Sequence, residues 1–170
     1  GLTAIKAGIG MHTGPLIIGI TGDENRLDAA TISDTVNTAA RIESLTKYYK
    51  TSLLLSGETM RYITQQEKFQ LRHLGKVQLK GKHNLLSIIE CINGDSAGKS
   101  AKKMDTLLQF NEAMKHYFEQ RFDDAIRLFE TILAIDPDDH TAKLFMGNAM
   151  KYAHDGIPEN WKGAEEMLHK

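Results

Sequence analysis

Two residues, Asn37 and Arg41, have the types and the spacing for chemistry on a phosphate group. They lie four positions apart in a segment with a helical pattern, so both side chains project from one helical face. A carboxamide beside a five-donor guanidinium suits a site that holds a polyanion and stabilises charge developing on phosphorus. The alternative is a surface helix whose polar side carries these residues without a function.

The helix that would carry the pair has clear start signals. Ser33 and Asp34, which follow an apolar stretch, are both good N-cap residues. Ser44 is expected on the same side of the helix as Asn37 and Arg41. The apolar stripe expected to face the core consists of Val36, Ala39, Ala40 and Leu45.

Strand-like segments surround this helix. Alternating apolar residues predict strands at 3–12, 15–22 and 27–32, with 23–26 as a hairpin tip between the last two, and then at 51–56 and 87–92. Residues 57–63 are typical of a brief helix, and 69–82 of an extended antiparallel hairpin. Strands and helices interleave, so residues 1–92 are expected to form an α/β or α+β domain.

The pattern changes after residue 92. Residues 93–103 are small and polar and predict a linker. A helical region is expected over 104–170. Its apolar stripes are Phe110, Ala113, Met114 and Tyr117, then Phe122, Ala125, Ile126, Phe129 and Leu133, and then Ala142, Leu144, Phe145 and Ala149. Asp138 or Asp139 can cap the third helix, and a short last helix is expected to contain Trp161, Ala164, Met167 and Leu168.

Composition limits the function classes. The 170 residues carry a formal net charge of −1, which argues against a dedicated nucleic-acid binder or anionic-membrane binder. The single cysteine, Cys91, excludes an internal disulfide framework, and its apolar setting predicts a buried strand position. The absence of a membrane-length apolar run indicates a cytoplasmic protein, or the cytoplasmic part of a membrane-anchored or multidomain signalling protein. Gly1 is not a start methionine, which indicates a fragment of a longer protein.

Residues 3–92 resemble the C-terminal half of a class III adenylate and guanylate cyclase catalytic domain. The motifs that carry the resemblance are His12-Thr13-Gly14, Gly22, Arg26, Asp34-Thr35-Val36-Asn37, Ala40-Arg41-Ile42-Glu43 and the segment LGKVQLKGK at 74–82. The resemblance implies a ferredoxin-like α+β fold with a mixed or antiparallel sheet. It also implies conversion of ATP or GTP to a 3′,5′-cyclic nucleotide and pyrophosphate, with adenylate cyclase favoured.

The resemblance assigns roles to individual residues. Asn37 matches the asparagine that positions the ribose, Arg41 the arginine that stabilises the phosphorus transition state, and Lys80 the lysine that holds the terminal phosphates. Ala30 stands at the position that reads the purine, where the family commonly has Asp or Thr, and Thr31 lies beside it.

The family's metal chemistry lies outside this sequence. Two aspartates that bind Mg²⁺ or Mn²⁺ in the family precede the segment matched here, and no residue of this chain replaces them. Family active sites form between two catalytic domains, so the resemblance implies a homodimer through residues 1–92. The other protomer would supply the metal ligands, and this chain alone should be inactive.

Residues 104–155 resemble a tetratricopeptide-type helical pair and part of another. The resemblance rests mainly on the run RFDDAI at 121–126 and on Tyr117, Phe129 and Pro137. Because such repeats are usually stable only when about three stack together, this region must pack on the cyclase domain, another protomer or a partner. The alternative to an enzyme is therefore a decayed cyclase-like dimerisation domain whose helical tail binds a partner protein.

Overall fold

The computed structural model describes residues 7–23, 26–79, 84–159, 161 and 163–167. Its strands are β1 Ile9–Met11, β2 Ile17–Asp23, β3 Arg26–Ile32, β4 Leu53–Ser56, β5 Leu71–Leu79, β6 Leu85–Cys91 and β7 Ala164–Met167. Its helices are α1 Asp34–Tyr49, α2 Gly57–Met60, α3 Ala97–Asp105, α4 Leu107–Phe118, α5 Phe122–Ile135 and α6 His140–Asp155, with short 3₁₀ turns at Gln66–Lys68 and Ile92–Gly94. Among the helices in these ranges, none combines the length and the apolar character that a membrane span requires.

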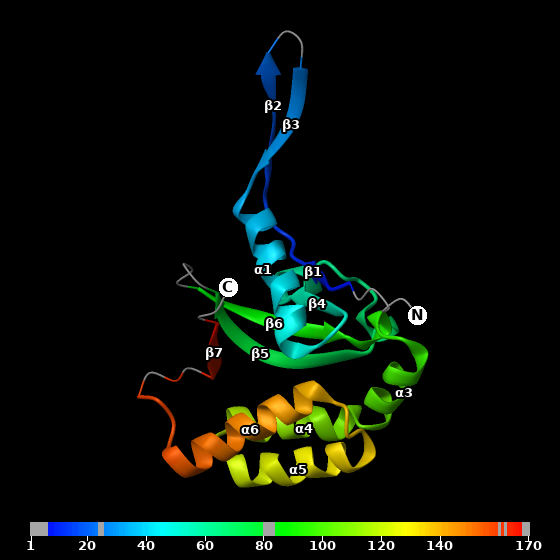
Figure 1. Cartoon of the computed structure of the whole chain (residues 1–170), viewed down its shortest axis with the longest axis vertical. Coiled ribbons are helices and arrows are strands. Elements are labelled where there is room, and N and C mark those ends of the chain that lie inside the picture. The colour runs from blue at the N-terminus through cyan, green and yellow to red at the C-terminus, as the bar shows by residue number, and fades with distance from the viewer. Residues whose placement is uncertain (1–6, 24–25, 80–83, 160, 162, 168–170) are drawn as a thin grey trace, which may run out of the picture.

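Five strands form one mixed sheet in the order β1-β4-β6-β5-β7. The pairs β1–β4 and β5–β7 are parallel, and the inner pairs are antiparallel. Strands β2 and β3 form a separate antiparallel ribbon, called the arm below, which projects away from the sheet (Figure 1). The expected α+β class with a mixed sheet is confirmed.

One face of the sheet is covered by α1 and by the bundle of α4, α5 and α6 (Figure 1). Buried side chains from all these elements form a single apolar cluster; they include Ile42, Tyr49, Leu74, Ile88, Phe110, Tyr117, Phe129 and Phe145. The other face carries a smaller cluster of Leu55, Met60, Ile89 and Cys91 beneath α2. The larger cluster is continuous. The bundle of α4, α5 and α6, called the helical tail below, therefore buries its apolar surface together with that of the sheet.

Strand β1 and helix α1 approach closely because the strand carries glycines. A Cβ atom at Gly10 would lie 2.2 Å from the backbone nitrogen of Glu43, and one at Gly8 would lie 2.0 Å from Oγ1 of Thr46. Any larger residue would push the helix away from the sheet. These glycines therefore fix the distance between α1 and the sheet.

The buried face of α1 differs from the predicted stripe. Leu45 is buried as expected, but Val36 is 45% exposed and Ala40 is also exposed, while Ala39 is half-buried. The buried residues are Thr38, Ile42, Leu45, Thr46 and Tyr49. The first turn of α1 lies at the base of the arm and the last turn lies against the bundle (Figure 1), so burial increases along the helix.

Residues 93–103, predicted to be a linker, are mostly ordered as a 3₁₀ turn and most of α3. Lys103 is only 4% exposed, because its ammonium group pairs with Glu90 and Asp95. Buried charge pairs of this kind hold the segment against the sheet. Composition alone did not reveal them.

Two further predictions of secondary structure were wrong. Residues 69–82 were expected to form a hairpin by themselves, but β5 is one strand that pairs with β6. The predicted last helix is replaced by β7, which pairs with β5 in parallel from Lys76 opposite Ala164 to Leu79 opposite Met167. The free edge of β5 offers unpaired backbone groups, and pairing with them outweighs a weak helical pattern. Leu168 lies outside the described residues.

Candidate active site

The polar face of α1 carries the predicted catalytic pair. Asn37, Arg41 and Ser44 are all exposed, as the sequence pattern predicted. In a helix, the Cβ atoms of residues four positions apart lie about 6 Å from each other. The amide and the guanidinium can therefore contact one ligand together from the solvent side.

The start of α1 is fixed by a cap and by a neighbouring loop. Ser33 is the N-cap: its Oγ accepts a hydrogen bond from the backbone nitrogen of Thr35 at 2.9 Å. The hydroxyls of Ser33 and Thr35 both donate to the carbonyl oxygen of Pro15, at 2.9 and 2.6 Å. Of the two predicted caps, Ser33 is the correct one. The turn that precedes Asn37 is thus tied to the loop between β1 and the arm.

The other side of this loop is also held in place. His12 Nδ1 lies 2.8 Å from Oγ of Ser56, and the hydroxyl of Thr13 donates to Oγ1 of Thr59 at 3.3 Å. The Thr59 hydroxyl donates to the carbonyl oxygen of Met11, also at 3.3 Å. His12 and Thr13 therefore act here as anchors between β1 and the β4–α2 junction.

For the other predicted site residues, Ala30, Thr31 and Lys80, the structure gives at most a position along a strand. Ala30 pairs with Gly19, and Thr31 with Ile18, near the base of the arm and shortly before α1 begins. Lys80 lies outside the described residues, directly after the last residue of β5. The structure therefore brings Asn37 and Arg41 together and leaves the position of Lys80 untested.

The described part of the chain contains no group of three His, Cys, Asp or Glu residues that could hold a metal ion. The acidic residues near α1 have other surroundings: Asp34 lies in the first turn of the helix, after the cap. Cys91 is buried, and burial raises the pKa of its thiol, so it is not a reactive ligand at neutral pH.

Sequence reasoning missed a buried ionic cluster on the bundle side of the sheet. Arg72 of β5 pairs with Glu90 of β6 at 3.3 Å and with Asp139 at the start of α6 at 2.7 Å. The possible signal was a charged pair, Arg72 and Glu90, at inward positions of adjacent strands.

Lys103 extends the cluster to Asp95. Desolvation by burial opposes both charges, but their mutual hydrogen bond and that from Ser52 outweigh it at Asp95, so the pKa of Asp95 is lowered. At Lys103 the charges of Glu90 and Asp95 likewise outweigh desolvation and raise the pKa. Both groups therefore stay ionised at neutral pH.

Comparison with known proteins finds cyclases that are similar to this chain. The terminal-differentiation-specific adenylate cyclase of Dictyostelium discoideum is 32% identical over 145 residues, which is 85% of this chain and 7% of that protein. An adenylate cyclase of Anabaena cylindrica is 42% identical over 91 residues, 53% of this chain and 18% of that protein. A match of 145 residues cannot fit before residue 104, so the first similarity extends into the helical tail. The chain thus spans less than a fifth of these relatives' length.

Guanylyl cyclases match as well. Retinal guanylyl cyclase 2 of Rattus norvegicus is 37% identical over 78 residues, 46% of this chain and 7% of that protein. A solved structure of a bacterial light-regulated adenylyl cyclase is 22% identical, covers 61% of this chain and 29% of that one, and has a TM-score of 0.45. The family model described as adenylate and guanylate cyclase catalytic domain matches residues 2–90, which is more than half of the chain. The chain therefore belongs to the class III adenylate and guanylate cyclase catalytic domain family.

Proposed function

We propose that this chain is the C-terminal part of a nucleotidyl cyclase domain that converts ATP to 3′,5′-cyclic AMP and pyrophosphate. The observation that carries the proposal is the exposed pair Asn37 and Arg41, on one face of a capped helix, in a chain of the cyclase family. We propose ATP and not GTP as the substrate, because three relatives that match over more than half of the chain are named adenylate cyclases.

The proposed reaction is an internal phosphoryl transfer. The ribose 3′-oxygen forms a bond to the α-phosphorus and its proton passes to water, while the bond from that phosphorus to the bridging oxygen breaks and pyrophosphate leaves with the electron pair. Arg41 would stabilise the charge on the equatorial oxygens, and Asn37 would orient the ribose. Lys80 would hold the outer phosphates as a point charge. Each role matches the donors that the side chain offers.

The metal ions of the family do not fit the residues described here, since these contain no ligand cluster. Ligands for Mg²⁺ or Mn²⁺ are proposed to come from a preceding segment of a partner protomer. This chain's own contribution is then to bind the nucleotide and to place donors around the reacting phosphorus. The proposed active unit is a dimer.

The arm supports the proposal of a dimer with a second copy of this domain. Ile17, Ile18 and Ile20 of β2 are 71%, 71% and 77% exposed. Adjacent residues of a strand face opposite sides, so Ile17 and Ile18 expose apolar surface on both faces of the ribbon. Exposed apolar patches of this kind are typical of protein interfaces. Strand β3 of the arm ends at Ile32, just before the first turn of α1, which carries Asn37, so a second protomer bound to the arm would lie near the site.

Base recognition is proposed for the end of β3. Ala30 has no side-chain donor or acceptor, and its neighbour Thr31 follows it on a strand, where adjacent residues face opposite sides. We therefore propose that backbone groups at Ala30, and not the Thr31 hydroxyl, contact the base. Ala30→Thr, which introduces a side chain common at this position in the family, is expected to change the ratio of ATP turnover to GTP turnover more than it changes their sum.

The test is an assay of the full-length protein with ATP and with GTP, each with Mg²⁺ and with Mn²⁺. Formation of 3′,5′-cyclic AMP from ATP is expected, and Asn37→Ala is expected to lower its turnover by about tenfold to a hundredfold. Lys47→Ala is the control: Lys47 is exposed in the last turn of the same helix, so its replacement should leave turnover unchanged.

A second function predicts a different result. If the domain is a decayed dimerisation module whose tetratricopeptide-like tail binds a partner, the full-length protein forms dimers but cyclises neither nucleotide. Ala30 in place of the usual base-reading residue is the observation that favours this alternative. Absence of turnover with both metals would replace the first proposal by the second.

A further inference from the structure

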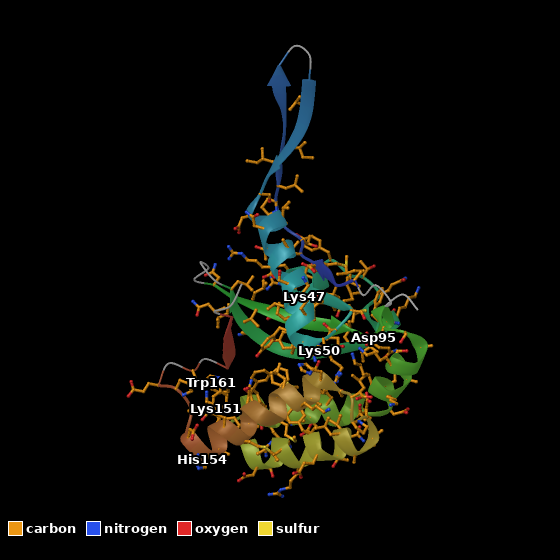
Figure 2. All side chains as sticks on the ribbon, viewed as in Figure 1. Lys47, Lys50, Asp95, Lys151, His154 and Trp161 are labelled. Carbon is orange, nitrogen blue, oxygen red and sulfur yellow. The ribbon has the colours of Figure 1, made fainter. Side chains whose placement is uncertain are left out.

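The bundle end of α1 is held by the helical tail. Thr141, in the first turn of α6, donates a hydrogen bond from Oγ1 to the carbonyl oxygen of Tyr49 at 3.1 Å. The Tyr49 ring stacks on Phe145 with centroids 6.2 Å apart, and both side chains are fully buried. Lys50, labelled in Figure 2, caps the helix in the left-handed conformation. The last turn of α1 is therefore fixed by α6.

Helix α6 is in turn fixed to the sheet by buried charges. The Arg72 guanidinium lies 3.4 Å above the centre of the Phe110 ring and pairs with Asp139 and Glu90. Asp139 also caps α6, since its Oδ1 accepts from the backbone nitrogen of Ala142 at 3.0 Å. All three charged side chains are at most 1% exposed. Such a group resists separation, because removal of one partner would leave an unpaired buried charge.

The bulge in β5 supplies a second attachment. The bulge lies between the pairs His73–Ile89 and Gly75–Ile88, which leave Leu74 without an opposite residue on β6. Gly75 follows it with a φ of 92°, and the ring of Phe118 at the end of α4 lies against this glycine. A Cβ atom at this position would be 2.2 Å from Cζ of Phe118. The strand thus carries a recess that only glycine provides, and the tail occupies it.

We propose that the helical tail is a positioning element of the catalytic unit, which sets the location of Asn37 and Arg41 by holding the far end of their helix. This inference rests on the cyclase function proposed above. Helix α1 has 16 residues and is therefore about 24 Å long, and a helix of this length transmits a shift at one end to the other. The contacts run from Arg72 through Asp139 and Thr141 to Tyr49, and α1 leads from there to the site.

The same arrangement limits what the tail can bind. Helices α4 and α6 pack against the sheet and α1, while α5 lies on the outer side of the bundle (Figure 1). A partner protein could occupy the inner face only by displacing the sheet. Partner binding there would therefore lower turnover instead of leaving it unaffected.

The test uses Thr141→Val, which removes the hydroxyl and keeps the shape, with Thr141→Ser as the conservative variant that restores it. Thr131→Val is the matched control, because Thr131 is exposed on α5 and bonds only within its own helix. Asp139→Asn is a second variant, since asparagine retains the cap but removes the charge that pairs with Arg72. Turnover and the amide hydrogen exchange of α1 are both measured in the full-length protein.

Thr141→Val and Asp139→Asn are expected to speed amide exchange in the last turn of α1 and to lower kcat about tenfold, with KM changed less than threefold. Thr141→Ser and Thr131→Val should match the wild type. Wild-type turnover in Thr141→Val despite faster exchange would overturn the proposal, and so would unchanged exchange. If the wild type itself cyclises no nucleotide, the proposed function fails, whereas the exchange result still decides whether the tail holds α1.

Discussion

The two ends of α1 are held in opposite ways. The first turn is fixed by hydrogen bonds from Ser33 and Thr35 to one loop carbonyl, beside an arm whose strand β2 exposes three isoleucines. The last turn is buried among aromatic rings and is held by a tail that ion pairs attach to the sheet. The open end leaves polar side chains accessible to solvent, as the proposed nucleotide and dimer sites require. The closed end supplies the stability that an exposed site cannot supply for itself.

The largest difference between the two ends should appear in stability. Phe145 is fully buried and contacts the rings of Tyr49, Tyr117 and Phe129. Phe145→Ala is expected to lower the free energy of unfolding by about 3 to 5 kcal/mol, because it leaves a cavity where the tail and α1 meet. Urea denaturation followed by circular dichroism measures this change.

Leu108→Ala is the control, since Leu108 is 81% exposed on α4 and should change stability by less than about 0.5 kcal/mol. Equal effects of the two substitutions would show that the interface between the tail and the sheet does not form as described.

A second substitution tests the recess in β5. Gly75→Ala is expected to cost about 2 to 4 kcal/mol, because alanine is strained at a φ of 92° and its Cβ would overlap Phe118. Gly98→Ala in α3, where an added Cβ meets no atom within 4 Å, should change stability by less than about 1 kcal/mol. A thermal melt of each variant distinguishes these results, and a Gly75→Ala protein as stable as the wild type would refute the role of the recess.

The smallest effect on stability is expected at the arm. Ile20→Lys should change the free energy of unfolding by less than about 0.5 kcal/mol, because the side chain is already 77% exposed. It should nevertheless weaken self-association, which sedimentation velocity measures on the full-length protein. Leu108→Lys also replaces an exposed apolar residue by lysine, but on the tail, and should leave association unchanged. If both substitutions or neither weaken association, the arm is not the interface.

The open end of α1 was largely predictable from sequence, because its signals are local. Ser33 stands where a cap is needed, and Asn37 and Arg41 are spaced to share a helical face. The class of fold and most strands followed from apolar alternation. The role of Lys80 in holding the terminal phosphates remains a prediction, since this residue lies outside the described residues.

The closed end was not predictable in the same way. Arg72 and Asp139 are separated by 67 positions, and no local pattern indicates that they meet. The buried face of α1 was misassigned because the glycines of β1 and the bundle, and not the apolar residues of the first turn, decide which side packs inward. Strand β7 was mistaken for a helix because its pairing depends on the free edge of β5. Contacts between distant segments decided all three.

Arg41→Ala tests most directly whether the exposed face of α1 catalyses nucleotide cyclisation. The variant is compared with Arg127→Ala, which removes an exposed arginine from α5, in the full-length protein at saturating ATP with Mg²⁺ and with Mn²⁺. Loss of the Arg41 guanidinium should lower turnover by about 10² to 10³, with KM changed only a few-fold, and Arg127→Ala should match the wild type. Turnover close to wild type in Arg41→Ala would show that this face of α1 does not carry the catalytic arginine.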